Sequence, residues 1–258
     1  MVNYRLLAID LDETLLTRDK RITDVTKHWI SKAAEAGVIV IFATGRGLQK
    51  IGEFRDELEL DTPMVLVNGA EVWKKPGQLL DRYYISKDDI RELHNLAIKA
   101  KASYWGYSVE SLTGPGTWTE EMFKRDWMKF GIRHNEHQVM DQLRTQVENS
   151  PSIEVTRSSI SNMEFSLKGI TKESGVRKVC EYLGVEMENV MAIGDNLNDL
   201  RLIQSAGLGV AMGNADDQLK QAADVITDTN ENDGVAKAIQ RFIFGINLET
   251  NKELSNVK

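Results

Sequence analysis

The sequence predicts an α/β protein in which a Rossmann-like, doubly wound parallel sheet is interrupted by an inserted α+β domain. Residues 6–9, 38–43 and 64–67 are short apolar runs without a polar face, as expected for strands buried on both sides of a parallel sheet. Helical patterns lie between these runs, so strand and helix alternate. The pattern changes in the middle of the chain and returns after residue 166, which indicates that one domain interrupts another.

The elements of the first part end at residues that suit helix caps and turns. Thr23 is a favourable N-cap for a helix that extends to Gly37, a residue type preferred just beyond helix ends. The second predicted strand stops at Thr44 and the third at Asn68. Polar groups therefore follow the carboxyl ends of neighbouring strands.

Residues 83–166 are predicted to form the inserted domain, and residues 1–82 and 167–258 the core. Within the insertion, alternating or aromatic-rich segments are typical of half-buried antiparallel strands. Strands are expected at residues 103–111, 152–159 and 162–167, and helices at 88–101, 120–129 and 136–148.

The last part of the chain repeats the α/β pattern. A helix over residues 172–183 is expected to end at Gly184, and a polar tail after Gly245 is expected to fray. The remaining expected elements are strands at 190–194, 208–213 and 224–227, a helix opening at 195–199 and a last helix at 233–244.

The composition excludes several classes of protein. Hydrophobic residues make up 41% and charged residues 28% of the 258 residues, as in soluble globular proteins. A net charge of −7 argues against nucleic acid as a partner. The longest apolar run, residues 38–43, is far shorter than the roughly 20 residues needed to cross a bilayer, so no membrane partner is expected. With Cys180 alone and no secretion signal, we expect a cytoplasmic protein, a monomer or weak homodimer.

Two acidic residues, Asp10 and Asp12, follow the first predicted strand. Side chains at i and i+2 of an extended chain point the same way, and ligands of open α/β sheets bind beyond the carboxyl ends of the strands. Two close carboxylates repel unless a cation or a proton lies between them. The pair therefore indicates a divalent-metal site or a nucleophile beside an acid/base, although alone it is more often a solvated turn.

Other polar residues are expected at the same edge of the sheet. Thr44 and Gly45 offer a hydroxyl and free N–H groups to a phosphate, and Lys172 opens a helix with an ammonium. Oxygen ligands that suit Mg²⁺ follow the strand at 190–194, namely Asp195, Asn198 and Asp199. Each has an ordinary structural interpretation, but their order along the chain favours one shared site.

Together, DLDETLL, ATGR, the lysine of ITKESG and GDNLND resemble the haloacid dehalogenase superfamily, and more narrowly its Cof-type hydrolases with a large α/β cap of class C2B. The segments VNGAEV, VAMGNADDQLK and NENDGVAKAI are similar to the same subgroup. The resemblance covers most of residues 4–243. It implies a Mg²⁺-dependent phosphatase of small phosphorylated metabolites, with the insertion as a cap over the site.

The resemblance also implies a role for each motif residue. Asp10 would be the nucleophile that becomes an aspartyl phosphate, and Asp12 would act as acid and then as base. Mg²⁺ would be held by the Asp10 side chain, the Asp12 carbonyl and Asp195, with Asp199 behind these ligands or in contact with the ion through water. The phosphate would be bound by the remaining groups: Leu11, Thr44, Gly45, Lys172 and Asn198.

Two positions depart from the family pattern. Glu13 replaces the usual glycine of DxDGT, and its side chain is expected to point away from the site because it neighbours Asp12 on extended chain. Glu173 replaces the glycine that often follows the motif lysine, which leaves Lys168 as a less favoured alternative to Lys172.

Two features of the insertion have competing interpretations. Its aromatic residues suit a platform for a sugar or base ring, but a core for the small domain is favoured: Tyr104, Trp105, Tyr107, Trp118 and Trp127. His134 and His137 form an HxxH, but they lie in an expected polar loop, and zinc sites need three or four ligands.

The substrate and the reaction type leave alternatives open. Sugar phosphates, nucleotides, flavin mononucleotide and pyridoxal phosphate all suit a capped site. A phosphate-transferring mutase or a non-catalytic phosphometabolite-binding protein on the same scaffold is the alternative to a phosphatase. A receiver domain is disfavoured because Asn68, not an acceptor aspartate, ends the third strand, and a P-loop kinase is excluded because no GxxxxGK[ST] occurs.

Overall fold

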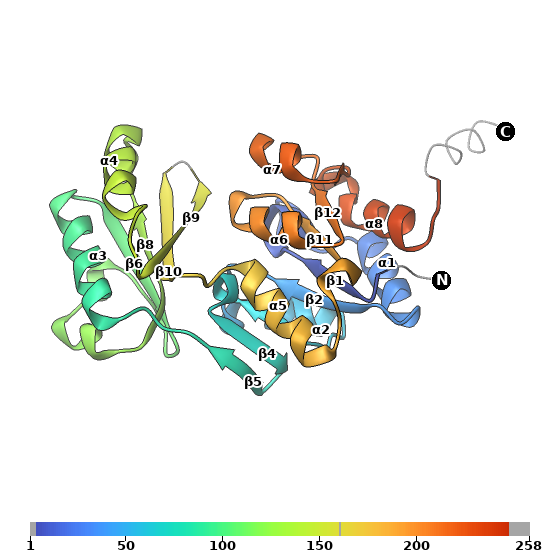
Figure 1. Ribbon diagram of the computed structural model, residues 1–258, viewed down its shortest axis with the longest axis horizontal. Coiled ribbons are helices and arrows are strands. Elements are labelled where there is room, and N and C mark those ends of the chain that lie inside the picture. Colours follow the sequence, from blue (N-terminus) through green and yellow to red (C-terminus); the bar gives the residue numbers. More distant parts are fainter. Residues whose placement is uncertain (1–3, 160, 248–258) are drawn as a thin grey trace.

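The computed structural model describes residues 4–159 and 161–247 and contains two sheets (Figure 1). An eight-stranded sheet has the order β13-β12-β11-β1-β2-β3-β4-β5, and a five-stranded sheet has the order β7-β6-β8-β10-β9. Each sheet has its own cluster of buried hydrophobic side chains. The predicted α/β fold with an inserted α+β unit is confirmed. No helix in these two ranges is long and apolar enough to span a membrane.

The larger sheet is parallel except at one edge. β4 and β5 form an antiparallel hairpin that extends the sheet beyond β3, an addition that the apolar pattern did not predict. The strands are β1 (Leu6–Ile9), β2 (Ile39–Ala43), β3 (Met64–Leu66), β4 (Glu71–Lys75), β5 (Gln78–Arg82), β11 (Val190–Gly194), β12 (Leu208–Ala211) and β13 (Val225–Ile226).

The strand order reverses at the centre of this sheet. α1 (Asp24–Glu35) leads from β1 to β2, whereas α6 (Leu200–Ser205) leads from β11 to β12 in the opposite direction along the sheet. Because such crossovers are right-handed, the two helices cover opposite faces. The loops after β1 and β11 diverge, and the crevice between them is where open α/β sheets bind ligands.

The helices of the core begin and end much as predicted. The Thr23 hydroxyl accepts a hydrogen bond from the Thr26 N–H at the start of α1, and Gly184 takes a left-handed φ of 63° after α5. The last helix is α8 followed by a π-helical turn (Ile239–Ile243). The tail expected to fray lies largely outside the described residues. The other core helices are α2 (Gly52–Glu57), α5 (Lys172–Leu183), α7 (Asp217–Ala222) and α8 (Gly234–Ala238).

The smaller sheet belongs to the insertion and is antiparallel throughout. Two helices, α3 (Lys87–Lys99) and α4 (His137–Val147), lie on the side of this sheet that is turned away from the core (Figure 1). Its other face is therefore turned toward the crevice. The strands are β6 (Ser103–Ser108), β7 (Leu112–Thr113), β8 (Trp127–Arg133), β9 (Ile153–Ser159) and β10 (Asn162–Leu167).

One predicted helix of the insertion is wrong. Residues 120–129 contain only a 3₁₀ turn (Glu120–Lys124), and β8 begins at Trp127. The polar loop around His134 is shorter than expected, because β8 continues to Arg133 and α4 begins at His137. β8 pairs with both β6 and β10 in the middle of the sheet, and this pairing overrides the helical spacing of the apolar residues.

Candidate functional site

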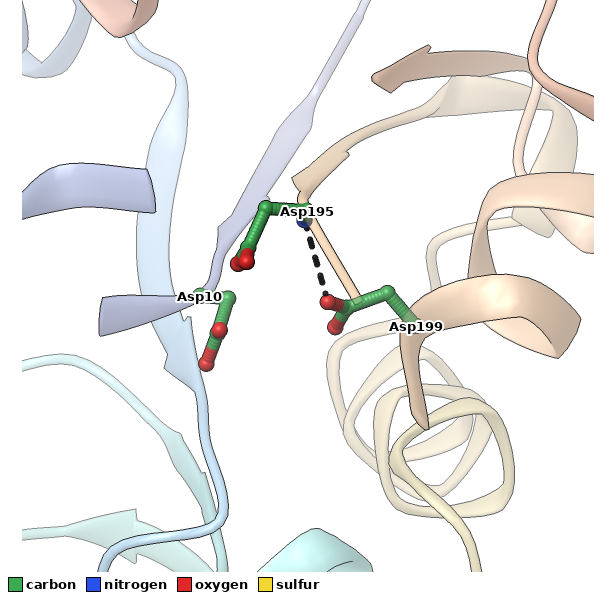
Figure 2. A group of neighbouring side chains, drawn as sticks. All are labelled: Asp10, Asp195 and Asp199. Carbon is green, nitrogen blue, oxygen red and sulfur yellow. Dashed lines mark hydrogen bonds between the residues drawn. The ribbon is translucent and has the colours of Figure 1, made fainter. Parts of the chain in front are cut away.

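Three aspartates from the two central strands form a carboxylate cluster at the crevice (Figure 2). Asp10 follows β1, Asp195 follows β11, and Asp199 ends the 3₁₀ turn before α6. One carboxylate oxygen from each lies within 4.8 Å of the others. All three residues are largely buried, with at most 8% of any residue exposed. The fold thus concentrates negative charge where it is poorly solvated.

A single buried ammonium faces this cluster. Lys172 is fully buried at the first turn of α5, and its Nζ lies 2.9 Å from Asp10 Oδ1 and 2.6 Å from Asp199 Oδ1. Lys168, the alternative motif lysine, is 46% exposed and lies 3.8 Å from Glu154. The structure therefore places Lys172, and not Lys168, against the predicted nucleophile.

The cluster holds more negative charge than Lys172 compensates. Burial raises the pKa of Asp10 to about 6, although Lys172 opposes the shift. Burial and the neighbouring Asp10 raise the pKa of Asp195 to about 8. Burial alone would lower the pKa of Lys172, but its two carboxylate partners raise it. Additional positive charge at this position would stabilise the ionised cluster.

The donor set fits a hydrated Mg²⁺ ion. Its groups are hard oxygen atoms, and Mg²⁺ binds few protein carboxylates and keeps several waters. The side-chain oxygen Oδ1 of Asn198 is buried and has no hydrogen-bond partner among the described residues, so it is available to accept from such a water. Asp195 is held by the Thr14 hydroxyl, which donates to its Oδ1 at 2.7 Å.

Asp199 has a structural function within the cluster. Its Oδ2 accepts hydrogen bonds from the backbone N–H groups of Asp195 and Asn196, both at 3.2 Å. Its Oδ1 accepts from Lys172. Because both oxygens are engaged, Asp199 fixes the loop after β11 and orients the ammonium.

Asp12 lies at the rim of the site with different partners. Arg46 donates two hydrogen bonds to its carboxylate, from Nε at 2.8 Å and from Nη2 at 2.7 Å, and Lys20 donates a third at 3.0 Å. Partial burial alone would raise the pKa of Asp12, but these hydrogen bonds lower it to about 2. The two aspartates of the DxD motif therefore occupy distinct environments.

The position of Glu13 explains why the family pattern has glycine there. Residues 11–15 form a tight turn, and Glu13 takes a left-handed φ of 57°, a conformation that glycine adopts freely. The expectation that its side chain points away is not met, because the chain is not extended. Glu13 lines the same cavity as Asp10, and its carboxylate lies 3.5 Å from Lys20 Nζ. Glu173, in contrast, is helical and pairs with Arg177.

Three of the predicted phosphate-binding residues, Thr44, Gly45 and Asn198, line one cavity of about 380 Å³. Thr44 is buried, and its hydroxyl oxygen accepts from the Arg46 N–H at 3.2 Å. Leu11 is fully buried, and its backbone N–H hydrogen-bonds to the Asp10 carboxyl group. Lys172 and Asp199 lie outside the lining, behind the carboxylates. The predicted residues that line the cavity are Asp10, Asp12, Thr44, Gly45, Asp195 and Asn198.

The inner face of the insertion forms the opposite wall of this cavity. The residues on it come from four neighbouring strands: Trp105, Tyr107, Leu112, Lys129 and Glu164. Tyr104, Trp118 and Trp127 belong to the hydrophobic cluster of the insertion, in agreement with the favoured interpretation of its aromatic residues. His134 and His137 are not part of any metal-type group found in residues 4–159 and 161–247.

The residues in or near the cavity that were not predicted include two from the core and two from the insertion. Arg46 and Asn68 lie within the quoted segments ATGR and VNGAEV, so the motifs contained the signal although no role was assigned to them. Lys129 and Glu164 lie on β8 and β10 of the insertion, where no motif marks them.

Comparisons with known proteins agree with this geometry. A family model described as haloacid dehalogenase-like hydrolase matches residues 7–130 and 116–239. The 5-amino-6-(5-phospho-D-ribitylamino)uracil phosphatase YcsE of Bacillus subtilis is 38% identical over 94% of this chain and 97% of its own length. The pyridoxal phosphate phosphatase YbhA of Escherichia coli is 29% identical over 91% of this chain and 97% of its own length.

Solved structures show the same fold. A haloacid dehalogenase-like hydrolase from Bacillus subtilis superposes with a TM-score of 0.86 at 22% identity, covering 92% of this chain and 99% of that one. BT1666 of Bacteroides thetaiotaomicron, titled among the phosphatases of this superfamily, gives 0.83 at 25% identity, covering 93% and 95%. The predicted family is confirmed, and the chain belongs to the haloacid dehalogenase-like hydrolases.

Proposed function

We propose that this chain is a Mg²⁺-dependent phosphatase that hydrolyses small phosphomonoesters through an aspartyl phosphate on Asp10. The observation that carries the proposal is the position of Asp10. Its carboxylate is buried at the base of a cavity, 2.9 Å from Lys172 and within reach of the oxygens of Asp195 and Asp199. A nucleophile held in this way meets a phosphate among groups that offset its charge.

The first chemical step is displacement at phosphorus. An Asp10 carboxylate oxygen forms a bond to phosphorus while the bond to the leaving oxygen breaks, and the leaving oxygen takes a proton from Asp12. Lys172, the Thr44 hydroxyl and the backbone N–H of Leu11 offset the charge of the transferred group. In the second step, Asp12 accepts a proton from water as that water attacks phosphorus and releases Asp10.

Arg46 restricts the donation of a proton by Asp12 in the first step. With both of its oxygens bound to Arg46, Asp12 is an ionised acceptor in this conformation, which suits the activation of water. Donation of a proton requires that Asp12 leave this pair when the substrate enters. Mg²⁺, bound by Asp10, Asp195 and the Asp12 carbonyl, would supply positive charge for the nucleophile and a phosphoryl oxygen.

The insertion, residues 83–166, acts as the cap in this proposal and sets the choice of substrate. Its wall combines aromatic rings with an ion pair between the buried Lys129 and the partly buried Glu164, 2.8 Å apart. A volume of about 380 Å³ suits a small metabolite. The similarity to phosphatases named for a ribitylaminouracil phosphate and for pyridoxal phosphate favours heterocyclic substrates of that size.

Asp10→Asn tests the proposal because it keeps the shape of the side chain and removes the nucleophile. The variant is expected to lose Mg²⁺-dependent release of inorganic phosphate from flavin mononucleotide and pyridoxal phosphate, and to take up no phosphate covalently. Near-wild-type turnover in this variant would contradict the mechanism. A wild-type enzyme that moved phosphate to the product without releasing it would instead be a mutase.

A further inference from the structure

A chain of hydrogen bonds runs from the cap to Asn198, which lies next to Asp199 in the sequence. In the cap, Glu164 Oε2 accepts from Lys129 Nζ at 2.8 Å, and it also accepts from Asn68 Nδ2 of the core at 3.0 Å. Asn68 Oδ1 in turn accepts from Asn198 Nδ2 at 3.3 Å. Asn198 also lines the cavity. The cap is thereby connected to the site through two consecutive amides.

The direction of each hydrogen bond fixes the orientation of the next amide. Because a carboxylate only accepts, Glu164 requires Asn68 to turn its NH₂ group toward the cap. The Asn68 oxygen must then face Asn198, which presents its own NH₂ group to it. This leaves Asn198 Oδ1 and its second N–H for other partners. Asn68 is 2% exposed, so its amide is shielded from water that would loosen the chain.

The contact between cap and core is tightly packed at this point. Lys129 is 3% exposed, and its Nζ also donates to the carbonyl oxygen of Gly45 at 3.0 Å. A Cβ on Gly45 would lie 3.0 Å from Asn68 Oδ1 and 3.3 Å from Lys129 Nζ. The backbone beside the predicted phosphate-binding hydroxyl of Thr44 is therefore held by a cap side chain.

We propose that Glu164 of the cap is a positioning residue for phosphoryl transfer, which acts through Asn68 to hold the Asn198 amide in the orientation that the site requires. The inference rests on the proposed function and assigns to a cap residue a task that does not depend on the leaving group. The phosphate site is then complete only when the cap is docked against the core.

A double-mutant cycle tests this link. Glu164→Ala is expected to lower kcat/KM on the order of 10- to 100-fold in the wild-type background, because a charge-assisted hydrogen bond is lost. In an Asn198→Ala background the same change is expected to cost less than about threefold, because its target is already absent. If the double variant lost kcat/KM by the full product of the two single losses, the proposal would be overturned.

Two further measurements separate positioning from other roles. The loss caused by Glu164→Ala is expected to be the same for flavin mononucleotide, pyridoxal phosphate and p-nitrophenyl phosphate, whereas a residue that binds the leaving group would discriminate among them. Glu164→Gln keeps an acceptor for Asn68 and is expected to retain activity within about fivefold of wild type. A loss in Glu164→Gln as large as that in Glu164→Ala would refute the role of the acceptor.

Glu154 provides a matched control. It is a buried cap carboxylate that, like Glu164, pairs with the core, through Arg201 at 2.7 Å, but it does not line the cavity. Glu154→Ala is expected to combine multiplicatively with Asn198→Ala.

The same double-mutant cycle can be measured without turnover, from the affinity for inorganic phosphate in the presence of Mg²⁺ determined by calorimetry. If the wild type were inactive but the two substitutions were coupled in phosphate binding, only the proposed function would be contradicted. If the wild type were active but Glu164→Ala and Asn198→Ala were not coupled, only this inference would be contradicted.

Discussion

Lys172 offers the sharpest test of the site because its contacts are known atom by atom. Lys172→Met keeps most of the aliphatic stem and removes the ammonium that lies 2.9 Å from Asp10 and 2.6 Å from Asp199. Loss of one partner from a buried ion pair costs about 3–5 kcal/mol, because the remaining charge is left without compensation. With roughly 2–4 °C per kcal/mol for a chain of this size, the melting temperature should fall by about 6–20 °C.

Urea unfolding with and without Mg²⁺ measures this loss, and phosphate release measures the catalytic effect. The loss of stability is expected to be smaller with Mg²⁺, because the ion supplies positive charge to the same carboxylates. Lys168→Met is the matched control, since Lys168 is 46% exposed and an exposed pair contributes about 0–1 kcal/mol. If the two variants had equal stability, or if Lys168→Met alone abolished turnover, Lys172 would not be the lysine of the site.

Four more predictions follow from the same geometry. Glu13→Gly should stabilise the protein by about 0.5–1 kcal/mol in urea unfolding, since relief of a positive φ exceeds the entropy cost of glycine, while Glu13→Ala should not. Gly47→Ala should raise KM several-fold, because the added Cβ would overlap the Tyr107 hydroxyl of the cap; Gly52→Ala, with nothing within 4 Å, should leave KM unchanged. Trp127→Ala empties a fully buried site and should destabilise the cap by about 3–5 kcal/mol, with proteolysis starting within residues 83–166; first cleavage in the core would contradict this. Chelation of Mg²⁺ should lower the melting temperature and abolish turnover, and addition of Mg²⁺ should reverse both; an unchanged melting curve would argue against an ion at the carboxylate cluster.

The core of the site was predictable because parallel topology leaves few choices. The carboxyl ends of parallel strands meet at one edge of the sheet, so residues that directly follow buried strands lie together whatever separates them in sequence. Asp10, Thr44 and Asp195 each follow such a strand. Their proximity depends only on recognition of the strands, and apolar runs without a polar face made that recognition secure.

The turn after β1 was not predictable by the same reasoning. The rule that residues i and i+2 point the same way holds for extended chain, but Leu11, between the two aspartates, already belongs to the tight turn of residues 11–15. Asp12 therefore reaches Arg46 and Lys20, while Asp10 faces Lys172. As a glutamate, Glu13 carries no sequence signal for positive φ, and the glycine of the family motif at this position is the signal that could have indicated a turn.

The inner wall of the cap shows most clearly why side-chain orientation needs tertiary information. Strict alternation along β8 would place Lys129 on the same face as Trp127. However, the pairing of β6 with β8 shifts in register between Tyr107 and Ser108, so that Tyr107 pairs with Lys129 and Ser108 with Trp127. Such a bulge turns the following side chains to the opposite face. Trp127 consequently packs in the cap cluster, while Lys129 faces the cavity and reaches Gly45. One inserted residue in the ladder thus determines that the cap presents a lysine to the site.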